Sequence, residues 1–278
     1  MKIGILGCGY VGKAAAQHFM QKEGVEVVVT TRQPERVTEL QSISTKVCLI
    51  QHPKDYREFL HDLNVLFITV APDSMADYQE TYLGTAIIIT ELLPHSPRLQ
   101  QIIYTSSTSV YGEHQGNWVS EVTPCTPLNA NSQILLETEN QLLTNWTANL
   151  NICIFRLGEI IGPNRSIVER LKNSPNKVYA GDGSQYSNLV QLTDIIQACE
   201  LAIDHQLSGI YNLCNDFHLT RKVLYEQICQ KFDLPPIQWD KNLKSMHGGN
   251  KRISSEKIKK MNFCFLEFNS NNLYPFTG

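Results

Sequence analysis

Strands and helices alternate through the first 160 residues of this 278-residue chain. Short β-branched or apolar runs predict strands at 2–6, 25–30, 46–50, 65–70, 101–106 and 151–156. Helical patterns separate them at 13–21, 34–42, 56–63, 77–93 and 131–145. The run VEVVVT at 25–30 is β-branched throughout, which suits a strand covered on both faces. This order predicts an α/β fold with a doubly wound parallel sheet of the Rossmann type.

Beyond residue 160 the alternation becomes less regular. Helices are expected at 194–204 and 220–232, with a strand at 209–213 between them. We expect a nucleotide-binding domain from 1–165 and 189–215, and a small α+β substrate cap from 166–188 and 216–278. The lysines near the end of the chain are expected to lie on a solvated face.

Composition and charge exclude several classes of protein. A net charge of −3 and a pI of about 6.2 argue against a basic nucleic-acid binder. No apolar run approaches the ~20 residues of a membrane span, and the opening MKIGILGCGY lacks the signal-peptide pattern. The eight cysteines and eight histidines form no CxxC, HxH or HExxH motif, so we predict neither a disulfide frame nor a metal site. We expect a cytoplasmic monomer or homodimer with no nucleic-acid or membrane partner.

The sequence GCGYVG follows the first predicted strand and opens the first predicted helix. In a dinucleotide-binding loop, Gly7 would allow a tight turn, Gly9 would admit a pyrophosphate, and Gly12 would let the helix pack on the strand. Tyr10 and Val11, within the same motif, are assigned to this site, since the N-terminus of the helix that follows attracts phosphate. This context predicts a cofactor site, with a ligand-free strand–helix turn as the alternative.

The end of the second predicted strand distinguishes the two nicotinamide cofactors. Folds that bind NAD place a carboxylate roughly 20 residues beyond the loop, where it accepts the ribose hydroxyls. This chain has Thr31 and Arg32 there, with Arg36 one turn later. Because guanidinium pairs strongly with phosphate, we predict NADP rather than NAD, unless Arg32 is only a surface residue. Ala71 and Ser106, after the fourth predicted strand and at the end of the fifth, are assigned to the same site.

A hydroxyl-rich segment, YTSSTSVYG at 104–112, ends the fifth predicted strand. Ligands of parallel sheets bind at the carboxyl ends of the strands, so this segment is a candidate for the reacting site. The alternative, for Thr105 and Thr108, is a polar strand end that satisfies its own backbone.

Four motifs resemble those of the extended short-chain dehydrogenase/reductase superfamily, the group of nucleotide-sugar epimerases and dehydratases. They are SSTSVYG at 106–112, FRLGEIIGP at 155–163, GDGSQ at 181–185 with LTD at 192–194, and GIYN at 209–212. The resemblance covers nearly the whole chain and implies a Rossmann cofactor domain with a small C-terminal substrate domain. It also places Ser107 at the position of the catalytic serine or threonine.

The chain departs from this superfamily at three places. Its glycine loop is GxGxxG rather than GxxGxxG. The YxxxK pair is missing, since none of the eleven tyrosines has a lysine four residues on, and Asn131 and Leu135 occupy those positions. Ser187 or Asn188 replaces the arginine that grips a sugar-nucleotide diphosphate. The chain therefore resembles atypical members described only as epimerase/dehydratase-like.

Without the YxxxK pair, carbonyl chemistry needs another proton donor. General acid–base help of this kind is worth roughly 10²–10⁴-fold in rate. Tyr111 is the best substitute because it lies one turn past Ser107, and Glu159 and His114 are weaker candidates. A ring packed under the loop is the alternative for Tyr111.

Two functions of different classes remain. The first is an NADP-dependent oxidoreductase that acts on a small carbonyl or hydroxyl substrate with an atypical proton donor. The second is a catalytically inactive NADP-binding sensor or regulatory protein. The missing YxxxK pair favours the sensor, whereas the Ser107 motif and the cap favour the enzyme. A sugar-nucleotide epimerase is a third possibility, weakened by the missing arginine and the missing pair.

Overall fold

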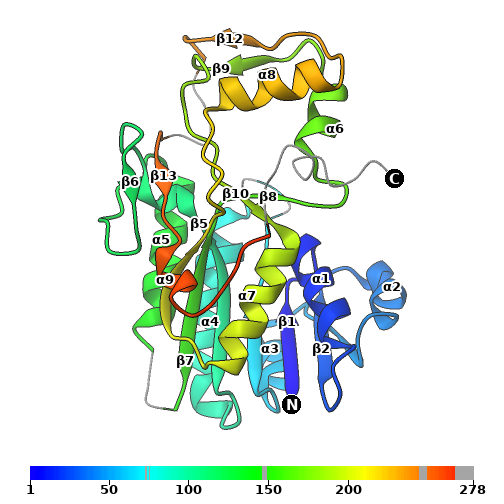
Figure 1. The fold of residues 1–278 in the computed structure, drawn as a ribbon. Coiled ribbons are helices and arrows are strands. Elements are labelled where there is room, and N and C mark those ends of the chain that lie inside the picture. Colours follow the sequence, from blue (N-terminus) through cyan, green and yellow to red (C-terminus); the bar gives the residue numbers. More distant parts are fainter. Residues whose placement is uncertain (73, 75, 146–148, 244–248, 267–278) are drawn as a thin grey trace. The chain divides into compact units, whose positions relative to one another are not determined.

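A computed structural model shows the fold of the chain (Figure 1). It describes residues 1–278 except 73, 75, 146–148, 244–248 and 267–278. The central sheet has seven strands in the order β11-β7-β5-β4-β1-β2-β3. These strands are β1 (Lys2–Leu6), β2 (Glu26–Thr31), β3 (Lys46–Leu49), β4 (Val65–Ile68), β5 (Gln101–Ser107), β7 (Asn151–Leu157) and β11 (Gly209–Leu213).

The sheet is parallel and doubly wound, as the alternation of elements predicts. β1 pairs in parallel with both β2 and β4, and the pairs β2–β3 and β4–β5 are parallel as well. The strand order reverses between β1 and β4. Such a reversal opens a crevice at the carboxyl ends of the strands, where ligands of this fold class bind.

The helices between the strands start and end near the predicted positions. They are α1 (Tyr10–Phe19), α2 (Val37–Gln41), α3 (Pro53–Leu60), α4 (Thr85–Leu92), α5 (Ala130–Leu143) and α7 (Leu192–Asp204). The predicted helix at 34–42 is instead a 3₁₀ turn, Pro34–Arg36, followed by α2. The long predicted helix at 77–93 contains a π-helical turn, Glu80–Gly84, before α4. Local hydrophobic patterns do not distinguish these helix types, because the backbone hydrogen-bond partner shifts by only one residue.

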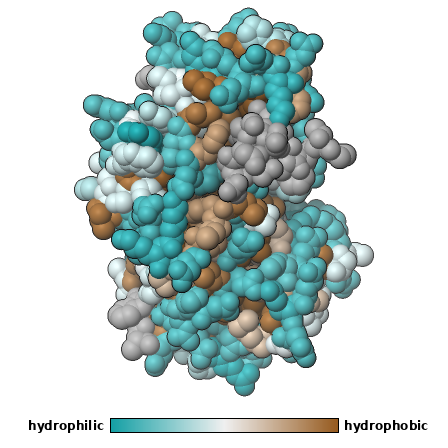
Figure 2. Space-filling view, in the orientation of Figure 1, coloured by the Kyte–Doolittle hydropathy of each residue, from teal (hydrophilic) through white to brown (hydrophobic). Residues whose placement is uncertain are grey.

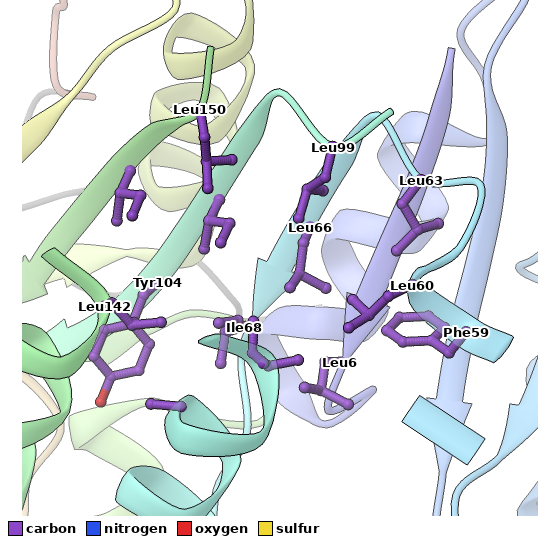
Figure 3. Close-up of a cluster of buried hydrophobic side chains, with 14 of the residues drawn as sticks. Leu6, Phe59, Leu60, Leu63, Leu66, Ile68, Leu99, Tyr104, Leu142 and Leu150 are labelled. Carbon is purple, nitrogen blue, oxygen red and sulfur yellow. The ribbon is translucent and has the colours of Figure 1, made fainter. Parts of the chain in front are cut away.

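The side chains of β4 show why both faces of the sheet are covered. Leu66 and Ile68 point into a buried cluster with Phe59 of α3 and Leu142 of α5 (Figure 3). Ile89 of α4 belongs to the same cluster. Phe67, between them in the strand, stacks on Phe19 of α1 with ring centroids 5.4 Å apart. Successive strand residues face opposite sides, so α1 lies on one face and α3, α4 and α5 lie on the other.

Shorter elements follow the sheet strands and the sequence analysis missed most of them. They are β6 (Trp118–Val119), β8 (Glu159–Ile161), β9 (Val178–Ala180), β10 (Leu189–Gln191), β12 (Gln238–Asp240), β13 (Arg252–Ile253), α6 (Ile167–Lys172), α8 (Arg221–Lys231) and α9 (Glu256–Lys259). The strands form the parallel pairs β8–β10, β9–β12 and β6–β13. Strands of two or three residues are too short to show a periodic pattern, and only α8 among these elements was predicted.

The chain divides into two compact units. The first consists of 1–106, 133–155 and 195–210, and the second of 107–132, 156–194 and 211–278. The division falls at the carboxyl ends of β5 and β7, so the segments that follow these strands group with the C-terminal part. The domain boundaries expected from strand order, with 1–165 in one domain, differ from this division and stay a prediction.

The face of the molecule drawn in Figure 2 is mostly hydrophilic, with hydrophobic residues in smaller groups. In the part of the chain that the structure describes, no helix is long and apolar enough to span a bilayer. The same described residues contain no group of three or more His, Cys, Asp or Glu side chains placed to hold a metal ion.

Candidate functional site

Two glycines of the loop between β1 and α1 are required by the backbone around them. Gly7 has φ of +94°, and a Cβ there would lie 2.7 Å from the Cα of Val70. A Cβ at Gly12 would lie 2.3 Å from the carbonyl oxygen of Gly7 and 2.8 Å from Oγ1 of Thr69. Gly7 therefore makes the turn and Gly12 lets α1 approach the loop, which are the roles that the motif predicts.

Gly9 is different, because nothing lies within 4 Å of a Cβ built on it. Its φ of −88° is outside the left-handed region, so neither a positive φ nor a close contact calls for glycine here. The helical hydrogen bonds of α1 begin with the Lys13 amide, which donates to the Gly9 carbonyl at 2.8 Å. Amides of a first turn precede the first helical donor, have no acceptor within the helix, and attract anions. The open space over Gly9 fits a diphosphate at this loop.

After β2 the chain brings one cation, Arg36, to the glycine loop, and the carboxylate of Glu39 pairs with it. Thr31 is buried, and its Oγ1 accepts a hydrogen bond from the Gln33 amide at 3.0 Å. Arg32 follows it and is exposed. The Arg36 guanidinium donates to the carbonyl oxygen of Cys8 at 2.7 Å, within the loop itself. Nε of Arg36 lies 3.7 Å from Oε2 of Glu39, which also pairs with Lys13, so the cation at the glycine loop already has a carboxylate partner.

The two remaining residues predicted for the cofactor site differ in exposure. Ala71 is exposed in the segment after β4. Ser106 is buried, and its Oγ donates to Oε1 of Glu139 on α5 at 2.5 Å. The Ser106 hydroxyl is thus committed within the protein, so a cofactor contact there would have to use its backbone. Both assignments stay predictions.

Ser107, the last residue of β5, begins a 3₁₀ turn at Thr108–Tyr111. Its Oγ accepts a hydrogen bond from the Ser109 amide at 3.1 Å. A hydroxyl can accept and donate at once, so this bond orients the oxygen and leaves its proton available for another acceptor. The side chain is half-buried, which suits a donor to a substrate oxygen.

Tyr111 is fully buried in the structure. Its hydroxyl donates to Oδ1 of Asn212 at 2.7 Å, and the Arg156 guanidinium lies 4.7 Å from the ring centroid. Burial raises the pKa of Tyr111 to about 12, although Arg156 opposes the shift. These contacts favour the packed-ring alternative over a proton donor.

Tyr111→Phe is expected to destabilise the fold. It removes the only donor that the structure shows for Oδ1 of the buried Asn212 among the described residues, and leaving such an acceptor unpaired costs about 1–3 kcal/mol. Urea unfolding measures the loss, with Tyr56→Phe on the half-buried face of α3 as the matched control. Equal stability of Tyr111→Phe and the parent would contradict this reading.

The weaker proton-donor candidates have partners of their own. Nε2 of His114 lies 2.9 Å from the Tyr111 carbonyl oxygen. Oε1 of Glu159 lies 2.5 Å from the Arg170 guanidinium, and both of these side chains are partly exposed. The positions of the missing YxxxK pair hold a half-buried Asn131 and a buried Leu135 on α5. Neither of these two can exchange a proton in the ordinary pH range.

Asn188, at or next to the position of the missing diphosphate-binding arginine, has a structural role. Its Nδ2 donates to the Lys251 carbonyl at 2.9 Å, and its Oδ1 accepts from the Ile253 amide at 2.9 Å. The neighbouring Ser187 is buried, and its amide donates to the Leu219 carbonyl. These residues connect the segment before β10 to β13.

Lys251 corrects the expectation that the C-terminal lysines are all solvated. It is 5% exposed, and its Nζ donates to the Gly112 carbonyl oxygen at 3.0 Å. Burial lowers its pKa to about 8, against the attraction of Glu113. The backbones are in close contact here, since a Cβ on Gly249 would lie 2.1 Å from the same Gly112 oxygen. A contact between segments this far apart in sequence leaves no local signal.

Comparisons with known proteins agree with this geometry. The family model described as "NAD dependent epimerase/dehydratase family" matches residues 3–214. Protein YeeZ of Escherichia coli strain K12 is 31% identical over 272 residues, which cover 92% of each chain. A functionally unknown conserved protein from Silicibacter pomeroyi has a similar structure, with a TM-score of 0.78 and 22% identity over 99% of this chain and 98% of that one.

Enzymes of the family share the fold as well. UDP-glucuronic acid 4-epimerase from Bacillus cereus, solved with UDP-glucuronic acid and NAD, has a TM-score of 0.81 at 17% identity, over 98% of this chain and 96% of that one. At such low identity the likeness shows the fold alone. The match of the family model over 3–214, however, covers more than half of the sequence. The chain therefore belongs to the NAD-dependent epimerase/dehydratase family.

Proposed function

We propose that this protein is an NADP-dependent oxidoreductase that acts on a small carbonyl or hydroxyl substrate. The observation that carries the proposal is the glycine loop. Gly7 and Gly12 are required by the fold, whereas the space over Gly9 is open and serves no packing purpose. A bound dinucleotide would supply hydride chemistry, and the loop and the first turn of α1 would hold its phosphates.

The preference for NADP is supported by the end of β2. Arg32 is exposed there, and Arg36 is attached to the loop through the Cys8 carbonyl. Solved relatives of this fold, such as the Bacillus cereus epimerase, contain NAD. A ribose with free hydroxyls would call for a carboxylate at the end of β2, and this chain has none at 30–32.

NADPH is therefore expected to bind more tightly than NADH. A charge-assisted contact to the 2′-phosphate contributes about 1.5–3 kcal/mol, which corresponds to a preference of roughly ten- to a hundredfold. Fluorescence titration with both cofactors measures it. Arg32→Ala should remove most of the preference, while Arg57→Ala, an exposed arginine on α3, should not. Equal affinities for NADPH and NADH in the parent would overturn the assignment.

For the chemical step, the structure supports Ser107 as the donor to a substrate oxygen. Its oxygen is oriented by the Ser109 amide, and the hydroxyl proton remains available. Proton transfer then falls to a group other than the packed Tyr111. Glu159 and His114 are the next candidates, and Glu159 is held by Arg170.

The inactive sensor stays as a second candidate because Tyr111 is packed and Asn131 and Leu135 replace the YxxxK pair. One assay separates the two functions. Purified protein is incubated with NADPH and a library of aldehydes and ketones while the absorbance of NADPH is followed. Turnover of any member supports the enzyme. Tight NADPH binding without turnover across the library supports the sensor.

A further inference from the structure

Two guanidinium groups converge on one phenol oxygen in the second compact unit. Arg170 on α6 and Arg221 at the start of α8 lie 3.0 and 3.1 Å from the Tyr225 hydroxyl. Tyr225 itself is 1% exposed. Two like charges brought together in this way repel each other, so the arrangement gains from a nearby anion.

The structure provides only part of that negative charge. Glu159 pairs with Arg170 at 2.5 Å. Among the described residues, no carboxylate lies within 4.0 Å of Arg221. The Arg221 guanidinium instead lies 5.4–5.9 Å from the ring centroids of Tyr179, Tyr225 and Trp239. The cluster of Arg170, Arg221, Tyr179 and Tyr225, here called the arginine cluster, thus holds two cations against one carboxylate.

Two polar atoms of the arginine cluster are buried with no hydrogen-bond partner within the described structure. They are the Tyr179 hydroxyl and Nε of Arg170. Tyr179 is 6% exposed, and burial raises its pKa, as does Tyr225, whereas Arg170 and Arg221 lower it. The Tyr179 hydroxyl therefore lies in the field of both guanidiniums. Buried polar groups are almost always paired, so unpaired donors beside excess positive charge point to a missing acceptor.

The carboxylate that pairs with the arginine cluster follows β7 closely along the chain. Glu159, the partner of Arg170, lies two residues beyond Leu157, the last residue of β7. The side chains of Arg170 and Glu159 are 39% and 41% exposed, so an anion from solution can reach them.

We propose that Arg170 and Arg221 bind an oxyanion group of the substrate, a carboxylate or a phosphate. A guanidinium presents paired N–H donors in the geometry that such groups accept, and the Tyr179 hydroxyl adds a further donor. The assignment to a substrate rests on the proposed function. With that function, the arginine cluster defines the substrate as a small anionic carbonyl or hydroxyl compound.

Thermal unfolding of the full chain tests the proposal directly. The probes are inorganic phosphate and malonate, each compared with sodium chloride at the same ionic strength. A ligand that binds only the folded state raises the unfolding temperature with its concentration. At least one of the two probes is expected to raise the unfolding temperature of the parent protein. A larger effect of phosphate indicates a phosphate ligand, and a larger effect of malonate indicates a carboxylate ligand.

The variant Arg221→Met removes the charge and keeps an apolar stem over the rings. It is expected to weaken binding of the effective probe by about ten- to a hundredfold, the loss of one charge-assisted contact. Lys222→Met, the exposed neighbour on α8, is the matched control and should respond like the parent. Phosphate can also bind the glycine loop, so the difference between these two variants isolates the arginine cluster.

If Arg221→Met fails to fold, Arg221→Lys keeps the charge without the paired donors and should show weaker binding than the parent. A response in Arg221→Met or Arg221→Lys equal to that of the parent overturns the proposal, as does a parent protein that no probe stabilises. NADPH titration is run alongside, and Arg221→Met should bind NADPH normally. If the parent protein does not bind NADPH but is still stabilised by the anion, the proposed function is refuted and the anion site is retained.

Discussion

Gly9→Ala is expected to lower the affinity for NADPH by about a hundredfold or more, because a methyl group would fill the space through which a pyrophosphate approaches the backbone. Its free energy of unfolding should fall by about 1 kcal/mol at most, the cost of alanine at the N-cap of α1. The reason is that no atom lies within 4 Å of the new Cβ and that φ is −88°. Fluorescence titration and urea unfolding give the two numbers.

Gly12→Ala, three residues away, is the matched control with the opposite stability outcome. Its Cβ would lie 2.3 Å from the Gly7 carbonyl oxygen, so the loop or α1 must move. Overpacking of this kind costs about 1–3 kcal/mol. A Gly9→Ala variant that binds NADPH like the parent would remove the main support for the cofactor site.

Ser107→Ala is expected to reduce turnover by roughly 10²–10³-fold, the usual cost of losing one oriented donor to a developing oxyanion. The substrate is first identified with the aldehyde and ketone library. NADPH affinity should remain close to that of the parent. Stability should fall only by the loss of one capping bond to the Ser109 amide, about 1 kcal/mol.

Ser106→Ala provides the comparison at the neighbouring position. Its Oγ donates to the fully buried Glu139 at 2.5 Å, so the variant should lose about 1–3 kcal/mol of stability because a buried acceptor loses this donor. The two variants would then indicate a chemical role for Ser107 and a structural role for Ser106. Full activity in Ser107→Ala, or equal stability losses in both variants, would show that the β5 end is not the reacting site.

The sequence predicted the turn of the glycine loop because the conformation of this turn depends on neighbouring residues. The turn at Gly7 and the start of α1 involve residues within one short segment, and each glycine has a physical reason visible in the motif. Tyr111 is the contrary case. Its distance along the chain from Ser107 made it a candidate donor, but its hydroxyl donates to Asn212, 101 residues away. Spacing along a chain shows proximity and says nothing about which partner a side chain selects.

The sequence by itself determined the parallel doubly wound sheet and the place of the glycine loop, since hydrophobic runs and glycine spacing are local properties. Only the tertiary structure decided which polar groups are available. It buried Lys251 against Gly112, committed Ser106 to Glu139, and brought Arg170 and Arg221 to one phenol oxygen. The Lys251–Gly112, Ser106–Glu139 and Arg170–Tyr225 contacts join residues 33 to 139 positions apart, and burial makes it costly to leave such polar groups unpaired. No periodic pattern records them, because each depends on how distant segments pack.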